Sequence, residues 1–146
     1  MPLHLKARKP ECERDECESL GARLRRRRRE LDLTQSEVAE RLGANLWSVL
    51  KWEQKGRLPS VEFYPAIIQF LGYEPWPEPS TLAEAHAAER RRRGLSISAV
   101  AAEIGVYEGT WTRWERGEWK LTHRTAEAVE RFLGVPIKTR FPADVR

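Results

Sequence analysis

The chain has 146 residues, which is room for one ordinary domain or for two very small ones. Its 26 Lys and Arg residues are offset by 22 Asp and Glu residues, so a net charge of +4 and a pI of about 9.3 make it only mildly basic. No apolar run approaches the roughly 18–20 residues of a membrane span, and the first residues lack the apolar core of a secretory signal. We therefore expect a cytoplasmic protein that makes no contact with a membrane.

Metal-binding side chains are few. The two cysteines, Cys12 and Cys17, have only His4 nearby, whereas a structural zinc site needs four well-spaced ligands. In a reducing compartment the default state of both cysteines is a free thiol. We expect no metal, no cofactor and no small-molecule ligand, and a redox role for the two thiols is left open.

An internal repeat organises the sequence. The segment Leu33–Gly43, LTQSEVAERLG, matches Leu95–Gly105, LSISAVAAEIG, at an offset of 62 residues. The same offset places the pair Trp52-Glu53 on Trp114-Glu115. So regular a match predicts that one structural unit is written twice.

Each copy is predicted to be a series of short helices. In the first copy Thr34 and Glu37 form the pattern of a capping box, Asn45 can cap the next helix, and Pro65 suits a first helical turn. The apolar spacing and the glycines that follow it predict helices over about 17–31, 34–43, 45–54 and 65–71.

The second copy follows the same plan, with a helix from about residue 81, a cap at Ser96, a stop at Gly105 and a third helix opened by Tyr107. Strand signals are absent, so the predicted class is all-α. Prolines at alternate positions between the copies predict an extended, semi-rigid linker. The predicted organisation is an N-terminal tail (1–16), domain 1 (17–73), a Pro-rich linker (74–80), domain 2 (81–136) and a C-terminal tail (137–146).

The first copy resembles the Cro and lambda-repressor family of DNA-binding domains. It carries Gly-x-x-Leu-Arg from Gly21, Leu-Thr-Gln-x-x-Val-Ala-x-x-Leu-Gly-x-Asn from Leu33, and Val-x-x-Trp-Glu ending at Glu53. The resemblance covers about residues 18–73 and, more loosely, 80–135. It implies two tandem helix-turn-helix domains of four to five helices each, with double-stranded DNA as the partner, in a prokaryotic or phage-type regulator.

Two arginine–glutamate pairs match a paired Arg and Glu of that family. Arg28 and Glu53 of the first copy correspond to Arg90 and Glu115 of the second. A buried charge is costly unless it is paired, so we predict that each pair locks the first helix of its domain to the third. The alternative is two exposed charges that happen to coincide.

The resemblance assigns DNA contacts to the first domain. Helix N-termini offer N–H groups to phosphate, and the predicted backbone contacts are Thr34, Gln35, Asn45, Ser48, Lys55 and Arg57. The base-facing positions are Leu46, Trp47, Leu50 and Lys51. Lys51 can reach guanine, whereas Leu46 and Trp47 offer only apolar contact, for instance to thymine methyl groups. The alternative is that these two pack against the other repeat, a tail or a partner protein.

The second domain departs from the pattern. Its predicted contacts are Ser96, Gly109, Thr110, Thr112, Arg113 and Arg116. Arg113 suits guanine, but Glu108 would repel phosphate and Ile97 replaces the glutamine. Trp111, at the position of Val49, is interpreted as core filling. We expect weaker DNA binding by this domain, and the alternative is a repeat kept for packing or dimerisation.

Two dense arginine runs, Arg25–Arg29 and Arg90–Arg93, favour nucleic-acid binding only modestly, because such runs are usually solvated helix faces. Two unequal linked reading heads predict an asymmetric or direct-repeat operator, whereas a homodimer would read a palindrome. A small protein of this kind represses most simply by occluding a promoter, so we expect a repressor bound at the nucleoid.

Two other functional classes compete with a DNA-binding regulator. An antitoxin or anti-activator built on this fold would bind a protein partner through an apolar surface, for which the candidates are Leu46, Trp47, Trp76 and Trp119. An enzyme is not expected, because the three histidines are scattered and no catalytic arrangement appears. Each histidine is interpreted as a surface residue.

Overall fold

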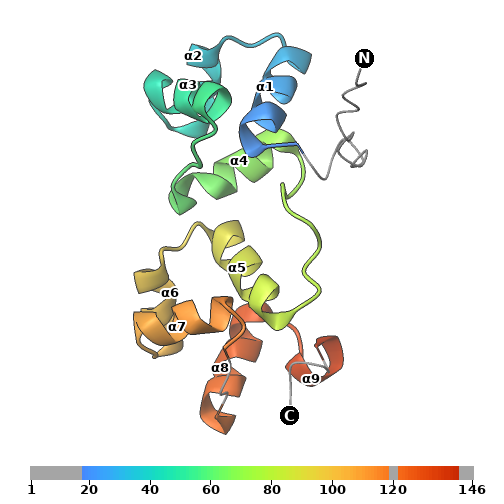
Figure 1. Ribbon diagram of the computed structural model, residues 1–146, viewed down its shortest axis with the longest axis vertical. Helices are drawn as coiled ribbons and strands as arrows, with labels where there is room; N and C mark the ends of the chain where they lie inside the picture. The colour runs from blue at the N-terminus through green and yellow to red at the C-terminus, as the bar shows by residue number, and fades with distance from the viewer. Residues whose placement is uncertain (1–17, 119–121, 142–146) are drawn as a thin grey trace, which may run out of the picture.

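A computed structural model describes residues 18–118 and 122–141, which form helices and connecting turns without a strand (Figure 1). The first copy contains α1 (Leu20–Glu30), α2 (Gln35–Leu42), α3 (Leu46–Lys55), the 3-10 helix η1 (Val61–Phe63) and α4 (Tyr64–Leu71). The second contains α5 (Leu82–Arg93), α6 (Ile97–Ile104), α7 (Glu108–Glu115), α8 (His123–Leu133) and α9 (Ile137–Arg140). The predicted all-α class is confirmed. Outside the described residues lie the N-terminal tail, His4, Cys12, Cys17 and Trp119.

Side-chain caps start α2, α3 and α6, whereas α7 begins without one. The hydroxyl of Thr34 accepts from the backbone N–H of Glu37 at 3.1 Å, and the Asn45 carboxamide oxygen accepts from Ser48 N–H at 2.8 Å. Such caps satisfy N–H groups that lack a partner within the helix. The turn after α2 begins at Gly43, whose φ of 67° is the left-handed conformation that glycine adopts without strain. The sequence did not predict η1.

Each copy buries its own apolar faces. The first core comprises Leu24, Val38, Ala39, Leu42, Val49, Trp52, Ile67, Phe70 and Leu71. The second comprises Leu82, Val100, Ala101, Trp111, Trp114, Val129, Phe132, Ile137 and Phe141. The two sets share no residue, so each copy has the separate core that a domain requires.

The predicted C-terminal tail begins too early. Ile137 and Phe141 are buried in the second core, and Ile137–Arg140 forms the short helix α9. Two apolar residues four positions apart lie on one face of a helical turn, which here covers the second core. The backbone N–H of Ile137 also donates to a Glu130 carboxylate oxygen at 3.1 Å, so α8 holds the start of α9.

His86 corrects the interpretation that every histidine is on the surface. Its side chain is 0 % exposed, and its Nδ1–H donates to the carbonyl oxygen of Leu82 at 2.6 Å. Its ring packs edge-on against the ring of Trp111, with 4.8 Å between the ring centroids. The signal was available in the repeat, because the 62-residue offset places His86 on Leu24, an apolar residue that is equally buried.

The two domains touch along one line of helices. The helix α4 and the preceding η1 contact α5, so the last helix of the first domain packs on the first helix of the second (Figure 1). The pairs α2–α3 and α6–α7 lie on the same side in this view, away from the linker.

Candidate nucleic-acid interface

An ion pair sets the angle between α1 and α3. Arg28 Nε and Nη2 donate to the two carboxylate oxygens of Glu53 at 2.9 and 3.1 Å. The Glu53 side chain is only 1 % exposed. The remaining Arg28 nitrogen, Nη1, donates to the carbonyl oxygen of Leu33 at 3.2 Å. A two-pronged pair of this kind fixes the orientation as well as the distance of its partners, and it ties the turn before α2 to α1.

The second domain contains the equivalent pair. Arg90 Nε and Nη2 lie 2.6 and 3.2 Å from the oxygens of Glu115, and Nη1 donates to the carbonyl oxygen of Leu95 at 3.3 Å. Every donor and acceptor is the counterpart of one in the first domain. In both domains the first helix is therefore joined to the third helix, and to the turn before the second, by the same set of polar contacts.

A third donor completes each pair, and it differs between the copies. The Gln35 amide donates to Glu53 at 2.9 Å, whereas in the second domain the indole N–H of Trp111 donates to Glu115 at 2.8 Å. Trp111 is fully buried in the core and also satisfies the carboxylate, a role that the sequence analysis missed. The paired change of Gln35 to Ile97 and of Val49 to Trp111 was the available signal.

The outer face of α3 carries an apolar residue at high exposure. Trp47 is 71 % exposed and Leu46 is 41 % exposed, while Ser48 and Leu50 are half-buried. Packing of Trp47 against the other repeat is therefore not seen within the described residues. Lys51, one turn further along α3, is exposed on the same outer face.

The predicted phosphate contacts divide into two kinds. Thr34 and Asn45 use their side-chain oxygens to cap α2 and α3, so the positive ends of both helices are ordered and exposed. Lys55 and Arg57 are exposed, and neither forms an ion pair with the described residues. Their charges remain available to an external anion, while the Gln35 amide is already engaged.

The side chains at the equivalent positions of α7 are smaller or more polar than those of α3. Arg113 and Arg116 are exposed and form no ion pair within the part of the chain that the structure describes, and Gly109 is exposed beside them. Thr110 is half-buried, and the Thr112 hydroxyl donates to the backbone oxygen of Glu108 at 2.9 Å. The Ser96 hydroxyl caps α6 by accepting from Ala99 N–H at 3.1 Å.

A protein-family model described as a helix-turn-helix domain matches residues 19–75 and 82–140. The chain belongs to the helix-turn-helix domain family. The predicted tandem pair of domains is confirmed, and the family supports a DNA-binding regulator in general. Comparisons with curated proteins and with solved structures give no match.

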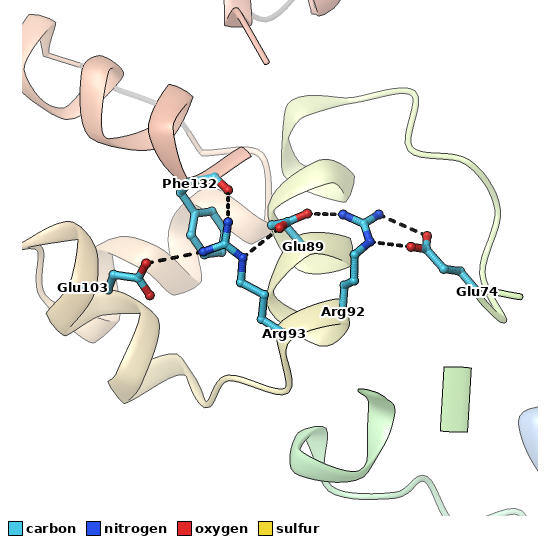
Figure 2. Close-up of polar contacts among 6 residues, drawn as sticks. All are labelled: Glu74, Glu89, Arg92, Arg93, Glu103 and Phe132. Atoms are coloured by element: carbon cyan, nitrogen blue, oxygen red, sulfur yellow. Dashed lines mark hydrogen bonds and ion pairs between the residues drawn. The ribbon is translucent and has the colours of Figure 1, made fainter. Parts of the chain in front are cut away.

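Most arginines in the run of the second helix-turn-helix domain bind other groups of the same protein. Figure 2 shows Arg92 between Glu74 and Glu89, and Arg93 bound to Glu89 and to the Phe132 carbonyl oxygen. Arg93 donates to Glu89 at 2.8 Å and to the Phe132 oxygen at 2.6 Å. Charges paired in this way add little to the field that an approaching DNA molecule meets. The run is therefore a structural feature more than a surface for phosphate.

Trp76 also departs from its prediction as exposed contact surface for this helix-turn-helix protein. It is half-buried, with its ring edge-on to Tyr64 at 5.9 Å and under the guanidinium of Arg91 at 5.9 Å.

Among the described residues no helix is long and apolar enough to cross a bilayer, and no group of three metal-binding side chains occurs.

Proposed function

We propose that this protein is a sequence-specific transcriptional repressor that reads double-stranded DNA with α3 of the first domain and, more weakly, with α7 of the second. One observation carries the proposal. Lys51 and Arg113 occupy equivalent positions in the two copies, both are exposed, and neither pairs with a carboxylate in the described residues. Lys and Arg are the side chains that bind guanine O6 and N7 in the major groove.

The contacts that set affinity would surround this reading face. The ordered N-termini of α2 and α3 offer N–H groups to phosphate, and Lys55 and Arg57 lie beyond the end of α3. Contacts of this type make binding depend on salt and carry little sequence information. The first domain would therefore contribute most of the affinity.

Trp47 gives the first domain an unusual reading group. An indole that is 71 % exposed at the start of α3 offers a wide apolar surface, which suits the C5-methyl group of thymine. On this proposal α3 prefers a site in which a thymine lies near the guanine bound by Lys51. Replacing Trp47 with Ala would relax selectivity at that thymine.

Repression follows from occupancy alone, since a protein bound over a promoter blocks polymerase without a further activity. The two reading faces differ, so one chain would bind an asymmetric or direct-repeat operator. We place this activity in the cytoplasm of a prokaryotic cell, at the nucleoid, and we propose no catalytic role.

Selection from a random DNA library with the intact protein, followed by a salt titration on the enriched site, tests the proposal. A discrete motif whose affinity falls steeply with salt is expected. No motif, with weak binding at physiological salt, would contradict it and direct attention to a protein partner at Trp47 instead.

Variants then assign the reading faces. Lys51→Ala should weaken binding to the selected site by about 1–3 kcal/mol and relax selectivity at one base, and Arg113→Ala should do the same at another base with a smaller loss. Arg131→Ala is the matched control, because Arg131 is an exposed arginine on α8, outside both helix-turn-helix pairs. Equal losses in all three variants would show a general charge effect and contradict the assignment.

A further inference from the structure

The two domains meet at a close contact between a proline and a glycine. A Cβ atom on Gly94, the residue after α5, would lie 2.9 Å from Cγ and 3.0 Å from Cδ of Pro65 in the first turn of α4. Real Cβ atoms do not approach other atoms so closely, and a proline ring in a helical turn has little freedom to move away. Only glycine fits at position 94 while α4 and α5 keep this spacing.

The linker is fastened to the same end of α5. Trp76 packs between Tyr64 of α4 and Arg91 of α5, with both ring distances at 5.9 Å. Next to it, Arg92 donates through both Nε and Nη2 to the carboxylate of Glu74, as Figure 2 shows. A half-exposed ion pair adds little stability, but its two-pronged geometry fixes a direction.

Comparison of the two copies shows that these contacts belong to the domain interface and not to the repeated unit. The 62-residue offset places Tyr64 on Ala126, Pro65 on Glu127, Glu74 on Pro136, Trp76 on Lys138 and Arg92 on Glu30. None of these five counterparts has the chemistry of the interface residue, whereas Arg91 has a like counterpart in Arg29. The contact therefore occurs once, between the copies, and the charged counterparts on the outer ends disfavour stacking of further units.

Comparison of Gly94 with its counterpart, Asp32, shows whether the turn or the domain contact requires glycine at position 94. Both residues have a positive φ, 67° at Gly94 and 54° at Asp32. The turn thus accepts Asp in the left-handed conformation, as short polar side chains do. Asp32 is exposed, whereas Gly94 faces Pro65, so it is the domain contact that requires glycine at position 94.

We propose that Pro65, Glu74, Trp76, Arg91, Arg92 and Gly94 form an interdomain clamp that holds α3 and α7 in one relative placement, so that the protein accepts only one spacing between its two half-sites. The inference rests on the proposed function and adds the specificity rule for it. These are positioning residues, since none of them lies on α3 or α7.

The geometry of DNA makes such a clamp selective. Each added base pair moves a half-site by about 3.4 Å and turns it by about 34–36° around the helix axis. A flexibly joined pair of domains adjusts to this change, whereas a rigid pair loses the contribution of one domain. Loss of the second linked contact lowers affinity by about 100-fold or more.

The first test measures affinity for the selected operator with one to five base pairs inserted between its half-sites. The intact protein should bind one spacing at least about 100-fold more tightly than its neighbours. Gly94→Asp should bind that spacing more weakly and should discriminate much less among spacings. Asp32→Gly is the control, because it makes the reverse exchange in the same turn without touching the interface, and its spacing profile should match that of the intact protein.

The second test needs no DNA. Spin labels on Ser36→Cys and Ser98→Cys, which are exposed and equivalent in the two domains, report the interdomain distance in a background with Cys12→Ser and Cys17→Ser. A single narrow distance is expected. It should broaden in Gly94→Asp and in Trp76→Ala, whose side chain belongs to neither core.

The outcomes separate the two proposals. A distance distribution as broad in the intact protein as in the variants overturns the clamp. A flat spacing profile together with a narrow distance overturns the spacing rule. A narrow distance together with no selected motif overturns the proposed function and the spacing rule, and leaves the clamp as the reason for the narrow distance.

Discussion

At the scale of single residues, Glu53 concentrates the polar framework of the first domain. Its carboxylate accepts from two nitrogens of Arg28 and from the amide of Gln35 while its side chain is 1 % exposed. A buried ion pair adds little net stability compared with an apolar pair, but loss of one member leaves an uncompensated charge. The pair is therefore best understood as a device that fixes the α1–α3 angle.

We expect Glu53→Gln to lower the free energy of unfolding by about 2–4 kcal/mol, because Arg28 would keep its charge at 16 % exposure without a counter-charge. Urea denaturation measures the change. Glu30→Gln is the control: it breaks the exposed Arg27–Glu30 pair and should cost less than about 1 kcal/mol. Similar losses in both variants would contradict the role given to burial.

His86 gives the protein a dependence on pH. Burial lowers the pKa of His86 to about 4, and the hydrogen bond to Leu82 and the charge of Glu115 only partly offset this effect. In the unfolded chain the pKa is near 6.5. The neutral ring is present in the folded core, so stability is fully present above about pH 6.5 and declines as the pH falls toward 4.

The expected loss between pH 7 and pH 4 that is due to His86 is about 3 kcal/mol. His86→Leu, which installs the residue that the first copy has at Leu24, should remove that part of the pH dependence in denaturation curves recorded across the range. His123→Gln changes an exposed imidazole and should leave it intact. An unchanged pH profile for His86→Leu would contradict the burial argument.

At the scale of elements, the equivalent helices α1 and α5 carry different small residues where they meet the third helix of their domain. A Cβ on Gly21 of α1 would lie only 1.9 Å from the backbone oxygen of Trp52 in α3, so these two helices are in backbone contact. The counterpart of Gly21 in α5 is Ala83, which requires more room against α7. A shared sequence pattern thus fixes which helices pack together and leaves their distance to individual residues.

Gly21→Ala should therefore destabilise the protein by about 1–3 kcal/mol, as overpacking of a close contact does. This reverses the usual effect, because Ala in a helix is more stable than Gly by about 0.5–1 kcal/mol. Gly109→Ala is the matched control in α7, where a Cβ meets nothing within 4 Å, and it should be neutral or stabilising. Thermal denaturation of the two variants compares them directly.

At the scale of the whole molecule, two separate cores are joined by one interface. The cores share no residue, and the link between them runs through η1, α4 and α5. Folding energy is therefore divided between the domains, while their relative placement depends on a small set of contacts. Substitutions in this small set can therefore change the relative placement of the domains without loss of either fold.

Leu82→Ala removes a fully buried side chain from the second core and should cost about 2–5 kcal/mol there. Amide hydrogen exchange should become faster across α6, α7 and α8, while α2 and α3 keep their protection because they belong to the other core. Equal acceleration in α2 and α3 would show that the two domains unfold as one unit.

The sequence by itself determined the repeat, the all-α class, the tandem helix-turn-helix plan and the helix starts at Thr34, Asn45 and Ser96. These features depend on local rules of spacing, capping and glycine conformation, which short segments carry on their own. The offset of 62 residues also contained the burial of His86, since its counterpart is Leu24.

Only the tertiary structure decided which arginines are paired with other groups of the protein and how the domains meet. Arg92 and Arg93 find Glu74 and Phe132 through contacts across 18 and 39 residues of chain. The contact of Gly94 with Pro65 likewise depends on the packing of α5 on α4. Pairings between distant segments follow from how the cores pack in three dimensions, and no local pattern in the sequence specifies them.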